Sequence, residues 1–271
     1  MTRRTVTSLL RAIGIAVIVI GFLGPIVWMI LASLKTNVDI YDPSKVLLFR
    51  PTTANYATVF GQSQYIDYVV NSFVVAAIST AASLVIAVPA AYAMARFLMR
   101  KSANLVLLAR VIPGVSLLIP WYYVFSNLKM VGGYFVLILA HMFVALPLIV
   151  YIMMSFFEQL PEELEESGQV DGLTPIGAFW RITLPLAAPG IATSTILAFI
   201  FSWNNFMFAL VLSSAQTKTL PVAIFDFIGY ASIDWGGLMA ASVVVTVPIM
   251  AIALFTQKYI VTGFTAGATK G

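Results

Sequence analysis

The chain has 271 residues, of which 61% are hydrophobic and 10% are charged, with a mean hydropathy of +0.97 and a net charge of +4. Soluble domains are roughly 45–50% apolar and about 25% charged, so this composition excludes an ordinary soluble domain and indicates an all-α polytopic membrane protein. The absence of cysteine and the single histidine exclude disulfides, thiolate metal sites, thiol nucleophiles and an imidazole metal cluster. A charge so small and scattered does not indicate nucleic-acid binding.

Six segments are apolar and long enough, at about 20 residues, to cross a bilayer as helices. They are residues 12–34, 69–95, 104–126, 134–156, 188–212 and 237–258. The first is longer than the core of a signal peptide, typically about 7–15 residues, and we expect it to be retained. We therefore expect six transmembrane helices in one membrane domain over residues 1–271.

The distribution of basic residues predicts the orientation of these helices, because lysine and arginine are retained on the cytoplasmic side of short loops. With the N-terminus inside, nine basic residues fall in inner segments and five in outer loops. The cluster Arg96, Arg100 and Lys101 then lies inside. Both termini and the polar segment 157–187 are predicted to be cytoplasmic, with an extended loop, 35–68, outside.

The polar segment 157–187 is predicted to form a short helix, a turn and a second short helix. Leu160-Pro161 and the acids after it suit a first helical turn, because carboxylates favour the positive end of the helix dipole. Gly172 permits the backbone reversal that other residues resist. Thr174-Pro175 is expected to open the second helix and Pro185 to end it.

The side chains of this segment allow two interpretations. Six of the chain's eleven acids lie here, namely Glu158, Glu162, Glu163, Glu165, Glu166 and Asp171. Acidic runs usually form solvated faces. The same segment carries Leu164, Val170, Leu173, Ile176, Phe179 and Trp180. These residues would leave an apolar patch in water, and such patches usually mark a partner surface, so we favour docking.

The spacing within this segment resembles the cytoplasmic "EAA" loop of ABC importer permeases, which docks on the ATPase subunits. The matching residues are Glu166, the small pair Ser167 and Gly168, then Gly172, and finally Ile182, Leu184 and Pro185. The family usually has two alanines at the small pair, and glycine there is expected to weaken the helix by about 1 kcal/mol relative to alanine. The resemblance also implies that Glu165 and Asp171 belong to the ATPase-coupling surface.

Short sequence motifs extend the resemblance from about residue 69 to the end of the chain and narrow it to the carbohydrate-importer branch of the family. They are Ala91-Tyr92-Ala93, Ile112-Pro113-Gly114, Ser202-Trp203-Asn204 and Gly263-Phe264-Thr265-Ala266-Gly267. The resemblance implies a type I ABC importer permease in a bacterial or archaeal plasma membrane. It implies as partners a second permease, two ATPases and an external solute-binding protein. The tail 263–271 is expected either to reach between the ATPases or to be disordered.

The chain contains no Gly-x-x-x-x-Gly-Lys-Ser/Thr loop and so cannot hold nucleotide phosphates in the Walker manner. We therefore expect ATP and Mg²⁺ on the partner ATPases, and a transport subunit without catalytic or metal sites of its own. Closure of the ATPases would push the polar segment and change the side of the membrane that the permease cavity faces.

Polar residues inside spans are candidates for the substrate pathway. Asn204 and Asn205, beside Trp203, lie roughly 12 Å from the outer end of their span, and His141 lies roughly 10 Å from the outer end of its own. Amides, an imidazole and an indole suit the hydroxyls and apolar faces of a sugar. The alternative is interhelical hydrogen bonding. We favour a cavity for the two asparagines and leave both interpretations open for His141.

Two further polar residues have open interpretations. Asn71, near the outer end of the second span, is either on the substrate pathway or interfacial. Arg110, inside the third span, either snorkels toward the cytoplasm or lines an inner vestibule.

The outer loop 213–236 occupies the position of the loop that enters the binding protein in the resembled family. Its polar residues Gln216, Lys218, Tyr230 and Asp234 are therefore candidate contacts to a binding protein.

The sequence thus predicts the permease subunit of an ATP-driven importer for a carbohydrate, in particular a di- or oligosaccharide. The alternative is a permease of the same architecture for glycerol phosphate, a peptide or a phosphonate. An intramembrane enzyme would need a catalytic cluster that the sequence lacks, and a secondary transporter would work without ATPases.

Overall fold

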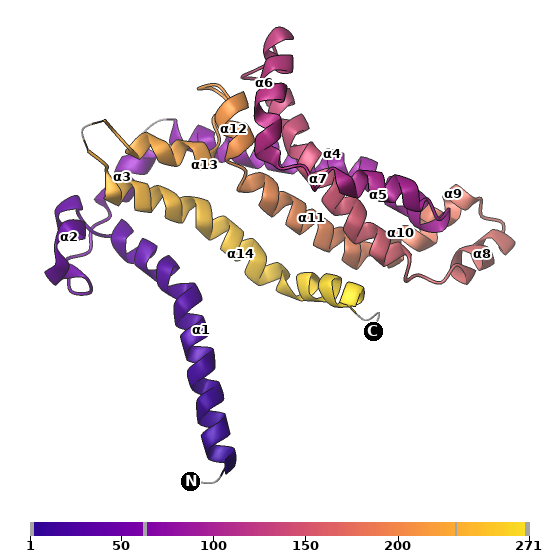
Figure 1. Ribbon diagram of the computed structural model, residues 1–271, viewed down its shortest axis with the longest axis horizontal. Helices are drawn as coiled ribbons and strands as arrows, with labels where there is room; N and C mark the ends of the chain where they lie inside the picture. The colour runs from indigo at the N-terminus through magenta and orange to yellow at the C-terminus, as the bar shows by residue number, and fades with distance from the viewer. Residues whose placement is uncertain (1–2, 62–63, 231, 269–271) are drawn as a thin grey trace. The chain divides into compact units, whose positions relative to one another are not determined.

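The computed structural model describes residues 3–61, 64–230 and 232–268, with side chains from residue 11 to residue 256 of these ranges. The described residues form helices joined by short connections (Figure 1). The α-helices are α1 (Arg3–Ser33), α2 (Asn37–Tyr41), α3 (Ala54–Gly61), α4 (Tyr65–Arg96), α5 (Arg100–Leu108), α6 (Leu118–Asn127), α7 (Tyr134–Phe157), α8 (Glu163–Val170), α9 (Pro175–Ala178), α10 (Leu184–Leu186), α11 (Ala188–Trp203), α12 (Met207–Leu212), α13 (Leu220–Ala223) and α14 (Trp235–Ala268). Between them lie the 3₁₀ segments η1 (Pro43–Lys45), η2 (Gly114–Leu117) and η4 (Ile224–Phe227), and the π-helical η3 (Phe179–Thr183). The side chains of the tail 263–271 lie outside the described residues.

Several helices are long and apolar enough to cross a membrane. Four are continuous over the described residues: Arg11–Ser33, Tyr65–Arg96, Tyr134–Phe157 and Trp235–Thr256. A fifth candidate is a broken span in which Pro175–Leu186 and Ala188–Trp203 meet at 71°. The prediction of an all-helical, multi-spanning protein is confirmed, whereas six continuous spanning helices are not found in the part of the chain that the structure describes.

The predicted span 104–126 is interrupted rather than continuous. α5 ends at Leu108, α6 begins at Leu118, and a turn followed by η2 lies between them. Pro113 provides the physical reason, because it has no N–H for the helical ladder and disfavours helical backbone at the residue before it. The backbone of Pro113 itself is extended, with ψ of 126°.

The predicted span 188–212 is interrupted in a similar way, between α11 and α12. The Asn204 Nδ2 donates to the Ile200 carbonyl at 3.0 Å, and the Asn205 Oδ1 accepts the N–H of Phe208 at 3.1 Å. Local side-chain hydrogen bonds of this kind offer the backbone an alternative to the helical ladder. The two amides therefore end one helix and open the next.

The contacts within the chain define two compact units, and each is described by itself. One unit comprises Met1–Ile66 and Ala223–Pro248, and the other comprises Asp67–Val222 and Ile249–Gly271. The single membrane domain expected over the whole chain stays a prediction.

In the first unit, Lys35 organises the segment that follows α1. Its buried Nζ donates to the Val46 carbonyl at 2.8 Å and lies 4.7 Å from the ring centroids of both Trp28 and Phe49. The Asn55 Nδ2 donates to the Lys35 carbonyl at 2.8 Å. The segment 35–68, which was expected as an extended loop, instead forms α2, η1 and α3, and these contacts tie it to the end of α1.

In the second unit, the core is built from small and large side chains of α4, α7 and α11. Its buried alanines are Ala87, Ala91, Ala95, Ala145, Ala187 and Ala198. α7 and α11 pack along each other (Figure 1). A Cβ at Gly190 of α11 would lie only 2.6 Å from the ring of Phe156 in α7. Small residues let membrane helices approach closely, so Gly190 determines how near these two helices come.

We predict that Gly190→Ala lowers the melting temperature of the purified protein in detergent, because overpacking a tight contact costs about 1–3 kcal/mol. Gly24→Ala is the matched control, since a Cβ on Gly24, also in an apolar helix, would meet nothing within 4 Å. Equal melting temperatures for the two variants would contradict the close approach of α11 to Phe156.

Candidate functional site

The polar segment 157–187 folds into a short helix, a turn and a second helix, as the sequence predicts. Gly172 has φ of +94° at the turn between α8 and α9, a conformation that other residues rarely adopt. The Thr174 Oγ1 accepts the N–H of Gly177 at 3.1 Å and caps α9. The second helix continues through η3 and α10 to Leu186, one residue beyond the predicted end at Pro185, which instead stands in the first turn of α10.

Two consecutive glutamates of α8 have opposite environments. Glu165 is only 7% exposed, whereas Glu166 is exposed. Successive helical residues are separated by about 100° around the axis, so one carboxylate faces the protein while the other faces away from it.

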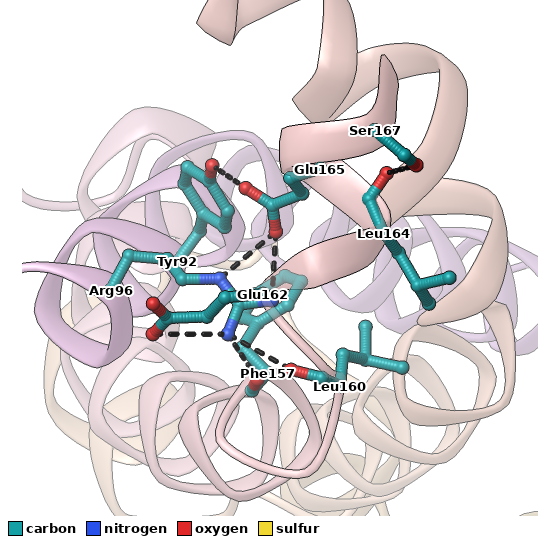
Figure 2. Close-up of polar contacts among 8 residues, drawn as sticks. All are labelled: Tyr92, Arg96, Phe157, Leu160, Glu162, Leu164, Glu165 and Ser167. Atoms are coloured by element: carbon teal, nitrogen blue, oxygen red, sulfur yellow. Dashed lines mark hydrogen bonds and ion pairs between the residues drawn. The ribbon is translucent and has the colours of Figure 1, made fainter. Parts of the chain in front are cut away.

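The Glu165 carboxylate is held by two residues of α4 (Figure 2). The Nε and Nη2 of Arg96 donate to Oε1 at 2.9 and 2.7 Å, and the Tyr92 hydroxyl donates to Oε2 at 2.5 Å. Tyr92 and Arg96 are four residues apart and therefore share one face of α4. Both oxygens of this carboxylate are thus bound by one helix face.

The same guanidinium also closes the end of α7. The Nη1 of Arg96 donates to the carbonyls of Phe157 and Leu160, each at 3.1 Å, and lies 3.9 Å from the Glu162 carboxylate (Figure 2). Carbonyls at a helix C-terminus have no partner within the helix. Arg96 satisfies them and so ties α4, the end of α7 and α8 together.

An aromatic cluster surrounds these polar contacts. The ring centroid of Tyr92 lies 5.5 Å from that of Phe157 and 4.6 Å from that of Phe179 in η3. Phe179 is buried, and this places the second helix of the polar segment against the same group. The cluster excludes water from the ion pair and strengthens it.

The pKa of Glu165 reflects these contacts. Burial raises the pKa of its carboxyl, but the hydrogen bonds from Tyr92 and Arg96 and the positive charge of Arg96 outweigh burial, so the pKa lies below the ordinary glutamate value. The carboxylate is therefore ionised at neutral pH. Since the folded-state pKa is lowered, its stabilising contribution is complete above the ordinary glutamate pKa and is lost as the pH falls through the lowered value.

The opposite side of the polar segment is exposed and mixed in character. Its exposed acids are Glu163, Glu166 and Asp171, and its exposed large apolar residues are Leu164, Val170, Ile176 and Trp180. Val170 is 87% exposed. An exposed apolar group bordered by carboxylates has the character of a protein interaction surface.

A second site lies where the two interrupted spans meet. A cavity of about 560 Å³ is lined from one interruption by Ala109, Arg110 and Ile112 and from the other by Asn204, Asn205 and Phe206. α7 contributes Phe143, Val144 and Leu148 to the same wall. The two predicted substrate-pathway asparagines are therefore brought together with Arg110.

The other candidates for the substrate pathway are not among the residues that line this cavity. His141 is buried, and its Nδ1 lies 2.6 Å from the Ser202 Oγ, which is 3.0 Å from the Ser79 Oγ of α4. Trp203 is buried and stacks on Phe199 with ring centroids 5.9 Å apart. The contacts of His141 join α7, α11 and α4, which is one of the two interpretations that the sequence left open for it, whereas Trp203 and Phe199 stack within α11.

Asn71 supports the outer loop from within the second unit. Its Nδ2 donates to the carbonyls of Gln216 and Lys218, each at 2.9 Å, and its Oδ1 accepts the hydroxyl of Tyr134 at 2.5 Å. The loop residues thus belong to different units, since Tyr230 and Asp234 lie in the first. Tyr230 is fully exposed.

Asp234 fixes the other end of the loop within the first unit. Its Oδ1 accepts from the Nδ2 of Asn37 at 2.9 Å and from the N–H of Gly237 at 3.0 Å. Contact of this loop with a binding protein stays a prediction.

The sequence did not single out Arg96 and Tyr92 as partners of Glu165. Arg96 entered only as a basic residue that indicates orientation. The available signal was their spacing, because a tyrosine and an arginine four residues apart share one helix face, at the end of a span that was predicted to lie on the same side of the membrane as the acid-rich segment 157–187. Among the described residues, no group of three His, Asp or Glu side chains is arranged to hold a metal ion.

Comparison with known proteins places these features in a family context. Residues 83–265 match the family described as the inner membrane component of binding-protein-dependent transport systems. A sulfoquinovosyl glycerol transport system permease protein from Agrobacterium fabrum is 36% identical over 97% of this chain and 94% of its own length. A trehalose/maltose transport system permease protein from Thermococcus litoralis is 34% identical over the full length of both chains.

A solved structure supports the same fold. A bacterial ABC transporter involved in the import of the acidic polysaccharide alginate matches with a TM-score of 0.81 and 19% identity, over 96% of this chain and 98% of that one. At this identity, the likeness shows the fold of the chain.

We predict that Arg96→Met destabilises the protein by about 1–3 kcal/mol, because it removes the positive charge and both donors from the Glu165 Oε1 and one donor each from the carbonyls of Phe157 and Leu160. Faster proteolysis of the 158–174 region in detergent would report the release of α8. Arg100→Met is the matched control, since Arg100 is exposed and no contact of its side chain is seen in the described residues. Adding Glu165→Gln to Arg96→Met should recover part of the loss by removing the unpaired charge; no recovery would contradict the ion pair.

We also predict that Tyr92→Phe raises the pH at which α8 opens in acid. Removing this hydrogen bond raises the folded-state pKa of Glu165 toward its ordinary value, so the stabilisation is lost at a higher pH. Hydrogen exchange of Glu163–Val170, followed through an acid titration and corrected for intrinsic rates, measures the shift. A transition at the wild-type pH would show that Tyr92 does not stabilise the carboxylate.

Proposed function

We propose, on the premise that this chain belongs to the family of binding-protein-dependent transport system inner membrane components, that it is the membrane-spanning permease of an ABC importer for carbohydrates. The family makes the chain a transport subunit. Full-length relatives support the cargo class, because the solutes in their names are sulfoquinovosyl glycerol, trehalose and maltose. No relative described here favours the alternative of a peptide, phosphonate or glycerol phosphate.

The exposed side of the polar segment serves as the docking surface for an ATPase. Its combination of Glu166, Asp171 and exposed apolar residues suits a groove that is apolar at its base and basic at its rim. Glu165 contributes differently, because its carboxylate is already bound by α4. It is a positioning residue that holds α8 in place.

The polar segment is linked to the cavity by two helices. α7 runs from the cavity residue Leu148 to Phe157 over about 14 Å, and α11 runs from Ala188 to the cavity residue Phe201 over about 20 Å. These two helices pack along each other. A displacement of the docking surface would therefore move both helices together and with them the cavity wall. Because Arg96 binds the end of α7 and also α8, the segment moves as one body with them.

The complete importer is assembled from this permease, a second permease, two ATPases that bind ATP and Mg²⁺, and an extracytoplasmic binding protein. The family description supports the binding protein, and the docking surface supports the ATPase. The chain spans the plasma membrane several times, with the basic cluster near Arg96 and both termini in the cytoplasm.

We predict that Glu166→Ala uncouples the importer, because it removes an exposed charge from the docking surface while leaving the Glu165 contacts intact. In proteoliposomes that contain the complete importer, ATP-driven uptake of labelled carbohydrate should fall about tenfold or more, as expected for a buried charged contact. The melting temperature of the permease should be unchanged. Gln169→Ala, an exposed substitution on the same helix, is the matched control.

We predict that Gly172→Ala also lowers ATP-driven uptake of carbohydrate, through backbone strain rather than loss of a charge. At φ of +94°, any residue with a Cβ is strained by about 1–2 kcal/mol, which would distort the turn between α8 and α9. Uptake at the wild-type rate by both Glu166→Ala and Gly172→Ala would refute the docking surface. Absence of uptake of every carbohydrate by the wild-type importer would refute the cargo class.

A further inference from the structure

The cavity beside the two interrupted spans has a feature that carbohydrate import alone does not explain, namely a lone positive charge. Its wall contains Arg110 and, among its other lining residues, none of the chain's acidic side chains. No hydrogen bond or ion pair of the Arg110 side chain is seen within the described residues, and the side chain is exposed within this chain.

Backbone geometry indicates that the cavity is hydrated. The interruptions at residues 109–113 and 204–206 leave backbone groups outside any helix. Non-helical backbone within a membrane span is tolerated only where it is buried in protein or lines a water-filled cavity. In transporters, discontinuous helices of this kind gather around the solute pathway. Both interruptions contribute to one wall, so the cavity is the natural place for a solute.

The guanidinium has no partner among the described residues and is therefore available to an anion in the cavity. Ionisable side chains within membrane spans are costly and pair with another charge or line a functional pathway. The residues that line the cavity include no acid of this chain, so an anion that binds Arg110 there comes from outside the chain. Arginine binds carboxylate, sulfonate or phosphate oxygens through two parallel N–H groups.

The neighbouring groups suit a sugar. The Asn204 Nδ2 is used within its own helix, which leaves its Oδ1 as an acceptor, and the Asn205 Oδ1 is used by Phe208, which leaves its Nδ2 as a donor. Phe143 and Phe201 in the same wall provide apolar surface for a sugar ring. The volume of about 560 Å³ lies within the range of ligand-binding cavities.

We propose that this cavity binds an anionic carbohydrate, with Arg110 as the contact to its acidic group and Asn204 and Asn205 as contacts to its hydroxyls. The proposal rests on the proposed function and narrows its cargo from carbohydrates in general to those that carry a carboxylate, sulfonate or phosphate. Arg110 is then a specificity-determining residue, because a neutral sugar leaves its charge without a partner.

The test uses the complete importer in proteoliposomes, with the same wild-type binding protein throughout. The solutes are charge-matched pairs, such as a uronic-acid disaccharide and the neutral disaccharide with a hydroxymethyl group in place of the carboxylate. We expect the wild type to import the acidic member. Arg110→Gln should raise the KM for uptake of that member by about 10- to 100-fold, with little effect on a neutral sugar. Arg110→Lys should give a KM for the acidic member between those of the wild type and Arg110→Gln, because it keeps the charge but loses the paired donors.

Lys101→Gln is the matched control, since it removes a cytoplasmic basic residue outside the cavity. Import of the neutral member alone, unaffected by Arg110→Gln, would overturn the anionic cargo while leaving carbohydrate import intact. Import of no carbohydrate at all would refute the proposed function itself.

A third outcome concerns the other source of an anion, a carboxylate of the second permease. If Arg110→Gln prevents co-purification of the two permeases while Arg110→Lys does not, the guanidinium serves assembly and the cargo proposal is wrong. Normal co-purification of the two permeases, together with the selective rise in KM for the acidic sugar, supports the cargo proposal.

Discussion

The structure depends on the requirement that every backbone polar group within a membrane finds a partner. Long helices meet this requirement by themselves, and α1, α4, α7 and α14 do so. The chain departs from helix only where another partner exists. At the end of α7, this partner is Arg96, whose guanidinium donates to the carbonyl of Phe157, the last helical residue, and to that of Leu160 in the turn that follows. At the interruption between α11 and α12, it is the pair of asparagine amides. At the interruption after α5, it is the short-range backbone bonds from the N–H groups of Arg110 and Val111 to the carbonyls of Leu107 and Leu108.

The bonds of Arg96 explain how the polar segment is held against α4 and α7. Exposed ion pairs usually contribute little, because water competes with them and long side chains lose entropy. Here the Arg96 and Glu165 side chains are each only 10% exposed, and the Tyr92, Phe157 and Phe179 rings shield them. A shielded contact of this kind fixes the position of α8 relative to α4 and α7. α8 is therefore bound directly to α4 and, through Arg96, to the end of α7.

Glycine has two distinct roles in the same region. Gly172 provides a backbone conformation, whereas Gly168 provides space, because a Cβ there would lie 2.4 Å from the Ile182 Cδ1. The sequence suggested that Gly168 would only weaken its helix relative to the alanine usual in the family. In the structure, Ile182 fills the vacated volume, so packing between α8 and η3 offsets part of that helix cost. The small residue at position 168 is therefore matched by the large side chain of Ile182 that packs against it.

The sequence by itself determined the membrane class, the helical fold, most of the spans and the boundaries of the polar segment. Each follows from composition or from local chemistry, such as the cap at Thr174 and the turn at Gly172, and local chemistry can be read from neighbouring residues. The tertiary structure alone decided that Glu165 faces inward while Glu166 faces outward, and that Arg110 shares a wall with Asn204. Those arrangements join residues between 69 and 94 positions apart in the chain, and such pairs are fixed by how helices pack rather than by any local pattern. His141 shows the same limit, because one polar residue in an apolar span fits a cavity or a neighbouring helix equally well until the packing brings Ser202 to its ring.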